Sequence, residues 1–234
     1  MEKSTTINPV HIFLKSKIID GTNKERNTLP ALPGFTLIQN YVSDAEETNL
    51  WNDLDSLPWV VDFSRKLQYY GYRNERTHPY HLVPIKEEIP DCMDFLTVKI
   101  MEDKLVFKRP DQVIINDYEP GQGIKPHFDR KDYFNNTIIG VSLGSDCLME
   151  FTRVKDGNKV SVFIPRKSLY ILEDEARYDW HHGIPSRKTD KLGNGNVLAR
   201  KRRISITYRN VIQDKVKKTG IVHEVASKLF KLVS

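Results

Sequence analysis

The segment from Asn116 to Asp129, which reads NDYEPGQGIKPHFD, carries two residues whose spacing suits metal binding. His127 and Asp129 stand two positions apart, so in an extended strand both side chains leave the same face while Phe128 leaves the other. With a second histidine they would form a triad that leaves three coordination positions open, which is typical of non-haem iron(II) oxygenases. An HxD pair alone is more often a surface or loop feature, so its partners decide its meaning.

The segment RYDWHHGI offers two candidates for the second histidine, His181 and His182. Adjacent residues of a strand point in opposite directions, so only one of the two can face a metal that His127 also faces. Periodicity alone does not choose between them. The chain between His127 and His182 is long enough for several strands, and the return path of a jelly roll would bring the later strand beside the earlier one.

Residues 203 to 211, RISITYRNV, predict a strand with a polar face and an apolar face. The polar face carries Arg203, Ser205, Thr207 and Arg209, and the apolar face carries Ile204, Ile206 and Tyr208. Two arginines on an inward face are costly to bury without anionic partners, and a dicarboxylate cosubstrate would supply them. Asn116 and Tyr118 share a face of an earlier strand and can donate hydrogen bonds to the same acid.

The run RKRR at residues 200–203 has a second interpretation, as a solvated basic stretch or a patch for nuclear import or nucleic acid. We expect solvent exposure for residues 200–202. Arg203 is the exception, because it shares the strand periodicity of Arg209.

A segment rich in cations and tyrosines, residues 62–83, precedes these strands and reads DFSRKLQYYGYRNERTHPYHLV. Such a mixture can stack a nucleobase and hold its phosphates. A β-hairpin at a sheet edge, with tyrosines paired across strands and cations facing water, is the alternative that the residues alone favour.

Short β-rich runs dominate the chain after Asp111. We expect strands at residues 112–118, 137–143, 147–152, 159–164, 168–172 and 203–211. Many short strands at this spacing predict a mainly β fold with a double-sheet jelly-roll core. Before them we expect a short strand at residues 34–41 and two flanking helices. A capping box of Ser43 and Glu46 would begin one helix, and Pro90 would begin the other.

Length and composition indicate a single globular domain of ordinary character. The chain has 234 residues and a net charge of +5, which favours a polyanionic partner such as nucleic acid. We expect an irregular lead-in over residues 1–30, a core domain over 31–213 and a helical extension over 214–234. Two isolated cysteines and no signal peptide or spanning segment predict an intracellular monomer, cytoplasmic or nuclear, without membrane contact.

The segments NDYEPGQGIKPHFD, SLGSD, PRKSL, RYDWHHGI and RRISITYRNV, in this order, resemble the AlkB family of iron(II)- and 2-oxoglutarate-dependent dioxygenases. The resemblance covers roughly residues 33 to 211 and is strongest to the branch that includes the tRNA wobble-uridine hydroxylase domain. It implies a double-stranded β-helix core, Fe(II) as the metal, and 2-oxoglutarate and O₂ as cosubstrates. The implied activity is oxidation of modified bases, by demethylation or hydroxylation, in RNA, tRNA or alkylated DNA that is single-stranded or has a flipped base.

The resemblance also implies residue roles. The iron ligands would be His127, Asp129 and His182, with the motif choosing His182 over His181. The cosubstrate would contact Asn116, Tyr118 and Arg203, and Arg209 would line the same site. The family places its nucleotide-recognition lid before the barrel. The candidates for substrate binding are therefore Arg65, Tyr69, Tyr70 and Tyr72.

Lys131 marks a departure from the DNA-repair prototype of the family, which has at this position a second acidic residue that reads the damaged base. We count Lys131 among the substrate-binding candidates, and we do not expect repair of methyladenine and methylcytosine to transfer simply. Two other hypotheses stay open. One is a protein-directed hydroxylase or demethylase on the same scaffold, and the other is a non-catalytic jelly roll that binds nucleic acid.

Overall fold

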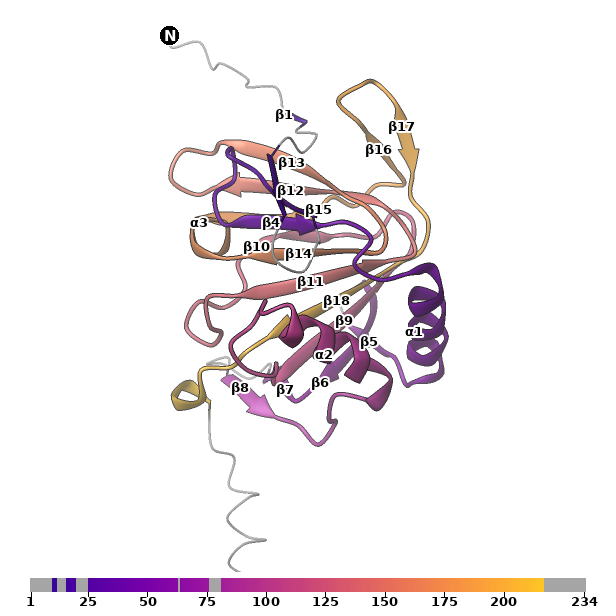
Figure 1. Ribbon diagram of the computed structural model, residues 1–234, viewed down its shortest axis with the longest axis vertical. Coiled ribbons are helices and arrows are strands. Elements are labelled where there is room, and N and C mark those ends of the chain that lie inside the picture. The colour runs from indigo at the N-terminus through magenta and orange to yellow at the C-terminus, as the bar shows by residue number, and fades with distance from the viewer. Residues whose placement is uncertain (1–9, 12–15, 20–24, 63, 76–80, 217–234) are drawn as a thin grey trace, which may run out of the picture.

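Two facing β-sheets form the core of the computed structural model, which describes residues 10–11, 16–19, 25–62, 64–75 and 81–216 (Figure 1). The larger sheet has the order β2-β3-β4-β14-β11-β18-β9-β6-β5. Its strands are β2 (Ser16–Ile19), β3 (Glu25–Thr28), β4 (Phe35–Ile38), β5 (Val60–Asp62), β6 (Arg65–Tyr70), β9 (Gln112–Tyr118), β11 (Ile138–Leu143), β14 (Ser168–Leu172) and β18 (Arg203–Arg209).

The smaller sheet has the order β1-β13-β12-β15-β10. Its strands are β1 (Val10–His11), β10 (Ile124–His127), β12 (Cys147–Arg153), β13 (Lys159–Ile164) and β15 (Trp180–Ile184). Consecutive strands of the chain after β9 mostly alternate between the two sheets, as a jelly roll requires. The predicted mainly β fold with a jelly-roll core is therefore confirmed.

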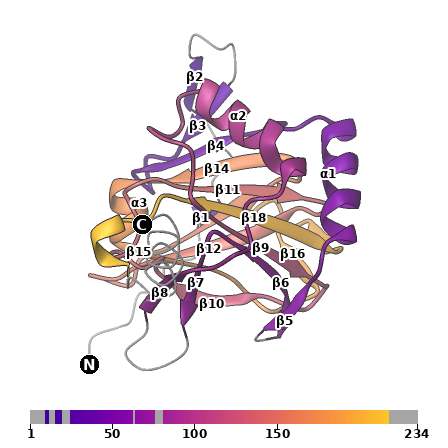
Figure 2. The ribbon, with the colours of Figure 1, turned by 90° about the horizontal axis from the view of Figure 1, so that it is seen from below.

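The helices lie on the outer side of the larger sheet, where α1 (Asp44–Ser56) and α2 (Asp94–Glu102) stand next to each other (Figures 1 and 2). The predicted capping box is present, because Ser43 Oγ accepts from the Glu46 amide at 3.1 Å and Glu46 Oε2 accepts from the Ser43 amide at 2.7 Å. A 3₁₀ turn, η1 (Asp91–Met93), leads into α2 directly after Pro90. The short α3 (Asp174–Tyr178) precedes β15.

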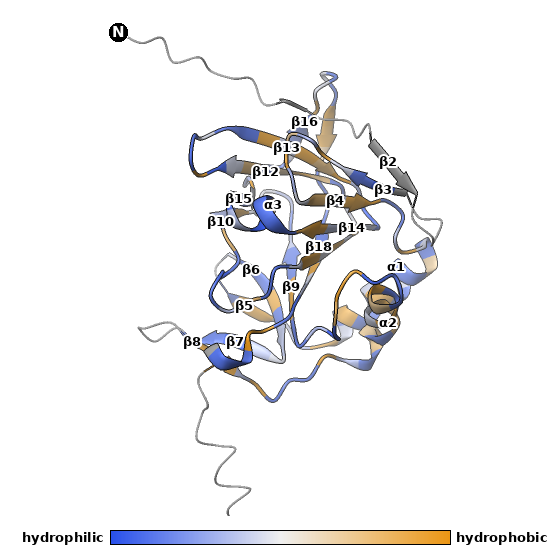
Figure 3. Ribbon diagram, turned by 60° about the vertical axis from the view of Figure 1, so that its left-hand side comes forward, coloured by the Kyte–Doolittle hydropathy of each residue, from blue (hydrophilic) through white to orange (hydrophobic). Residues whose placement is uncertain are grey.

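The larger sheet is covered on both faces, and β11 is buried along its whole length. Ile139 and Val141 belong to the apolar cluster under the helices, while Ile138 belongs to the cluster between the sheets. Gly140 has no room for a side chain, since a Cβ there would lie 2.1 Å from Cζ of the Tyr170 ring on β14. Figure 3 shows hydrophobic stretches of β14 and β18 in the interior and hydrophilic loops around them.

Two hairpins complete the described part of the chain. One joins β7 (Tyr72–Glu75) to β8 (His81–Pro84), and the other joins β16 (Thr189–Lys191) to β17 (Val197–Ala199). The β7–β8 hairpin falls in the cationic and aromatic segment, for which a hairpin was one of the two predictions. The β16–β17 hairpin was not predicted.

The prediction that residues 200–202 face solvent is wrong for two of the three. Arg200 is only 8% exposed, and its guanidinium binds both oxygens of the fully buried Asp190 at 2.7 Å. Arg202 joins Asp55 at the end of α1 to Asp117 on β9, with its Nε 2.9 Å from Asp117 Oδ1. Only Lys201 is exposed. The run is basic because buried carboxylates elsewhere in the fold require cations.

The N-terminal end of the chain differs from its predicted organisation where the structure describes it. Residues 25–28 were expected to belong to an irregular lead-in, but they form β3, which extends the sheet by pairing with β4. At the other end, η2 (Gln213–Lys215) follows β18. The predicted helical stripe of Ile221, Val225 and Leu229 lies outside the described residues. No helix in the described residues is long and apolar enough to cross a membrane.

Candidate active site

Two histidines meet where β10 and β15 pair. His127 and His182 are cross-strand partners with ring centroids 4.5 Å apart. Asp129 lies two residues beyond the end of β10, and its Oδ2 lies 3.5 Å from Nε2 of His182. His181 turns to the other face of the strand, where its ring lies 4.1 Å from the Phe128 ring. Of the two candidate histidines, His182 is therefore the one that joins His127 and Asp129.

Burial and neighbouring charges set the protonation of this cluster. Burial raises the pKa of Asp129, but Arg209, His182 and His127 lower it more, so the pKa lies well below its usual value and the carboxyl is ionised. Burial, with the charge of His127, lowers the pKa of His182 to about 3. At neutral pH His182 is therefore a neutral imidazole. Neutral imidazole and ionised carboxylate are the forms that ligate metals.

The two oxygens of the Asp129 carboxylate contact different residues. One oxygen contacts Nη2 of Arg209, and the other faces His182. Accordingly, the described residues contain no group of three or more His, Cys, Asp or Glu side chains already gathered tightly enough to hold an ion. The donor types and their proximity nevertheless fit iron(II), for which two imidazoles and one carboxylate are a suitable set.

Arg177 on α3 holds the chain at this cluster and was missed by the sequence analysis. It is 2% exposed, and its Nη1 donates to the Asp129 carbonyl at 2.6 Å, while its Nη2 donates to the Arg130 carbonyl at 3.1 Å. These bonds restrain the backbone that carries the Asp129 carboxylate. Its position in the RYDWHHGI segment was the available signal, but an arginine that binds main-chain carbonyls has no periodicity to reveal it.

Arg203 enters the interior from β18, on the same face as Ser205 and Thr207, as predicted. It is 3% exposed, its Nε donates to Ser142 Oγ at 2.9 Å, and its Nη1 has no hydrogen-bond partner among the described residues. A buried guanidinium with an unsatisfied N–H is expensive unless an anion completes it. The residues present thus fit a carboxylate of a small diacid.

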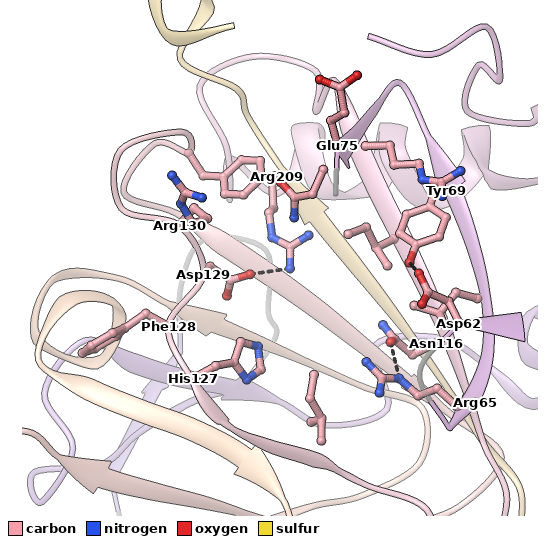
Figure 4. A pocket seen from close by; sticks show the side chains of 16 residues that line it. Asp62, Arg65, Tyr69, Glu75, Asn116, His127, Phe128, Asp129, Arg130 and Arg209 are labelled. Carbon is pink, nitrogen blue, oxygen red and sulfur yellow. Dashed lines mark hydrogen bonds and ion pairs between the residues drawn. The ribbon is translucent and has the colours of Figure 1, made fainter. Parts of the chain in front are cut away.

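Two adjoining cavities lie at the cluster of His127, Asp129 and His182. A small inner cavity of about 50 Å³ is lined by residues that include Asn116, Tyr118, His182 and Thr207. A larger outer cavity of about 320 Å³ lies between this region and β6 (Figure 4). Five side chains line both cavities, namely Asn116, Ile124, His127, Asp129 and Arg209. A group that enters from the outer cavity would therefore meet the histidine and carboxylate cluster.

The predicted substrate-binding residues of β6 separate according to the face of the strand from which they project. Arg65 and Tyr69 on β6 line the outer cavity, and the Tyr69 hydroxyl donates to Asp62 Oδ2 at 2.8 Å (Figure 4). Tyr70 faces the opposite way, packs in the cluster under the helices and is 8% exposed. This placement argues against the predicted substrate contact, because neighbours on a strand face opposite sides.

Two further candidates also lie outside the cavity lining. Tyr72 follows Gly71, whose φ of 75° turns the chain into β7. The Tyr72 hydroxyl donates to Gln213 Oε1 at 3.2 Å. Lys131 lies with Nζ 3.8 Å from the centroid of the Phe128 ring and donates to the Tyr178 carbonyl. Conversely, sequence analysis missed four charged residues of the lining, which are Asp62, Arg73, Glu75 and Arg130. Two of them, Arg73 and Glu75, belong to the β7 hairpin strand.

Comparisons with known proteins show similarities of sequence and fold. The family profile described as the 2OG-Fe(II) oxygenase superfamily matches residues 54–209. The chain is 51% identical over 193 residues to "Uncharacterized protein L905" of Acanthamoeba polyphaga mimivirus, covering 82% of this chain and 91% of that protein. It is 32% identical to the tRNA (carboxymethyluridine(34)-5-O)-methyltransferase ALKBH8 of Macaca fascicularis over 77% of this chain, and it spans only 31% of that protein. The solved structure of OsALKBH1 shares the fold, with a TM-score of 0.61 over 79% of this chain and 99% of the other at 13% identity.

Proposed function

Because this chain belongs to the AlkB family of the 2OG-Fe(II) oxygenase superfamily, we propose that it oxidises modified bases in nucleic acid, in RNA such as tRNA or in alkylated DNA. The metal and cosubstrates of the superfamily are Fe(II), 2-oxoglutarate and O₂, in agreement with the sequence prediction. Oxidation of an N-methyl group would end in loss of formaldehyde, whereas oxidation of a carbon substituent would leave a stable hydroxyl.

The meeting of His127, Asp129 and His182 at the boundary of the two cavities is the observation that carries the proposal. These three side chains would hold Fe(II). The bound metal would activate O₂, with one oxygen atom used to convert 2-oxoglutarate to succinate and CO₂ and the other transferred to a substrate C–H bond. The chain contributes the neutral imidazole of His182, the ionised carboxylate of Asp129 and the cavity that would hold the reacting group.

The cosubstrate would lie in the inner cavity. Arg203 would bind its distal carboxylate through the N–H that no described residue satisfies. Asn116 and Tyr118, which line that cavity, would donate hydrogen bonds to the same acid. Arg209 would stay next to Asp129, where its charge keeps the Asp129 carboxyl ionised. The same arginine would lie near the metal-proximal carboxylate of 2-oxoglutarate.

The walls of the outer cavity suit a nucleotide. Arg73 and Arg130 supply cations for phosphate, and Tyr69 supplies a ring for stacking. A cavity of about 320 Å³ is within the usual size for a small ligand, so a single base would enter it flipped out or from a single strand. The net charge of +5 agrees with a polyanionic partner.

A monomer in the cytoplasm or nucleus is part of this proposal.

The test is succinate formation after loading with Fe(II) and 2-oxoglutarate without oxygen, followed by exposure to O₂. We expect methylated oligonucleotides or tRNA to raise succinate well above the level without substrate, and lysine-methylated peptides to leave it unchanged. Mass spectrometry of the digested nucleosides then separates loss of a methyl group from gain of an oxygen. Stimulation by peptides alone would move the substrate class to protein, and nucleic-acid binding without any succinate would indicate a non-catalytic module.

Asp129→Ala is the matched control for this assay. It removes the carboxylate donor, so succinate formation should fall to background, while circular dichroism should show an unchanged β-rich fold. Succinate formation by a folded Asp129→Ala variant would contradict the proposed metal site.

A further inference from the structure

A buried hydrogen bond joins the wall of the outer cavity to the inner cavity. Nε of Arg65 on β6 donates to Oδ1 of Asn116 on β9 at 2.8 Å (Figure 4). Both residues are 8% exposed. The two strands are antiparallel neighbours, with Leu67 opposite Asn116, so the Arg65 side chain starts two residues away and on the same face. The contact therefore follows from the strand register and involves a desolvated charge.

This hydrogen bond determines which way the Asn116 amide faces. A guanidinium has only donors, so the amide atom that faces it has to be the oxygen. The Nδ2 group is then turned away from Arg65, as Figure 4 shows, and it makes no hydrogen bond with any described residue. Asn116 lines both cavities. Its amide thus offers a fixed N–H donor to an acceptor in the site.

We propose that Arg65 is a positioning residue for the cosubstrate, which fixes the Asn116 amide so that Nδ2 donates to a carboxylate oxygen of 2-oxoglutarate. This inference rests on the proposed function and gives Arg65 a role other than the substrate contact predicted from the sequence. Without Arg65 the amide can rotate and present its oxygen to the carboxylate, which replaces an attraction by a repulsion. The Arg65 guanidinium also lies 5.4 Å from the centroid of the Tyr118 ring, the second predicted donor.

Binding of 2-oxoglutarate to protein loaded with Mn(II) in place of Fe(II), measured by titration calorimetry, tests this role without turnover. We expect Arg65→Met to weaken 2-oxoglutarate by about tenfold, which is a typical loss for a hydrogen bond to a charged group. Arg65→Gln should weaken it by roughly threefold, because a glutamine can either donate or accept and so allows both amide orientations. Arg65→Lys keeps a donor-only group and should stay within about twofold of the unchanged chain.

Lys66→Met is the matched control, because Lys66 is the next residue on β6, is exposed and lines neither of the two cavities. It should leave 2-oxoglutarate affinity unchanged. Asn116→Ala supplies the second control, since removal of the amide removes the group that Arg65 orients. Adding Arg65→Met to Asn116→Ala should then cause no further loss, within about twofold. Arg65→Gln decides the question should Arg65→Met fail to fold, as judged by thermal unfolding.

The outcomes separate the inference from the function on which it rests. Absence of any 2-oxoglutarate binding by the unchanged Mn(II)-loaded chain would overturn the proposed function and this inference with it. Normal binding that is insensitive to both Arg65→Met and Arg65→Gln would overturn the inference alone. So would an equal loss from Arg65→Met with and without Asn116. A raised KM for nucleic acid with unchanged 2-oxoglutarate affinity would return Arg65 to substrate binding.

Discussion

His127 and His182 face each other across the β10–β15 pair. His181, which precedes His182 on β15, points to the opposite face of the sheet and contacts Phe128. The two adjacent histidines of the HH pair therefore occupy different environments. His182 lines the inner cavity beside Asp129, and His181 contacts the Phe128 ring and lines neither cavity. This difference provides a matched pair of substitutions.

His182→Gln should lower Mn(II) or Fe(II) affinity by about 100-fold or more and abolish succinate formation, because it removes an imidazole donor from the cluster. His181→Gln should bind the metal as the unchanged chain does. Metal titration by calorimetry measures both, and thermal unfolding shows that each variant is folded. Equal losses of metal affinity in the two variants would mean that both substitutions disturb the β10–β15 pair and that His182 is not specifically a metal ligand.

Arg203→Met should weaken 2-oxoglutarate by roughly 10- to 100-fold, since it removes a buried charge-assisted hydrogen bond to a carboxylate. Arg202→Met is the control from the same basic run. It leaves the buried Asp117 without its cation, so it should lower the free energy of unfolding by about 2 kcal/mol without changing 2-oxoglutarate affinity. Calorimetry and urea unfolding separate the two effects. If Arg203→Met changed only stability, the arginine would be a structural cation like its neighbour.

The faces of β18 illustrate what periodicity can predict. Alternation along RISITYRNV assigned Ile204, Ile206 and Tyr208 to one face and Arg203 to the other, and the structure has them so. The capping box at Ser43 was equally readable, because its bonds join residues three apart. Local rules of this kind need no knowledge of the tertiary fold.

The errors arose where the partner lies far away in the chain. Arg200 and Arg202 were taken as part of a solvated basic run, yet the fold brings Asp190 and Asp117 into contact with them. Tyr70 was grouped with Tyr69 because both belong to an aromatic run, although the strand sends them to opposite sides. Composition describes the segment as a whole, and only strand register tells which half faces the cavity.

Tyr69→Ala and Tyr70→Ala should therefore fail in different ways. Tyr70→Ala removes a buried ring from the cluster under the helices and should cost about 3 kcal/mol of unfolding free energy. Tyr69→Ala should cost little stability but weaken nucleic-acid binding by roughly tenfold, as expected for loss of one stacking ring. Urea unfolding and fluorescence anisotropy with a labelled oligonucleotide measure the two quantities. A stability loss in Tyr69→Ala as large as that in Tyr70→Ala would show that Tyr69 is a core residue.

Asp190 predicts an acid-dependent loss of stability. Burial raises its pKa, but hydrogen bonds from Arg200, the Leu148 amide and Arg187 lower it more, so the folded-state pKa lies below the usual 3.8. A depressed pKa means that the carboxylate stabilises the fold fully above the unfolded-state value, and that this contribution is lost as the pH falls through the folded-state pKa. Asp190→Asn should therefore cost about 3 kcal/mol at neutral pH, and the difference from the unchanged chain should shrink at pH values below 3.8. Asp156→Asn, which alters an exposed ion pair, is the control and should change the urea midpoint very little at either pH. If the stability difference between Asp190→Asn and the unchanged chain stayed constant with pH, packing and not charge would make Asp190 necessary.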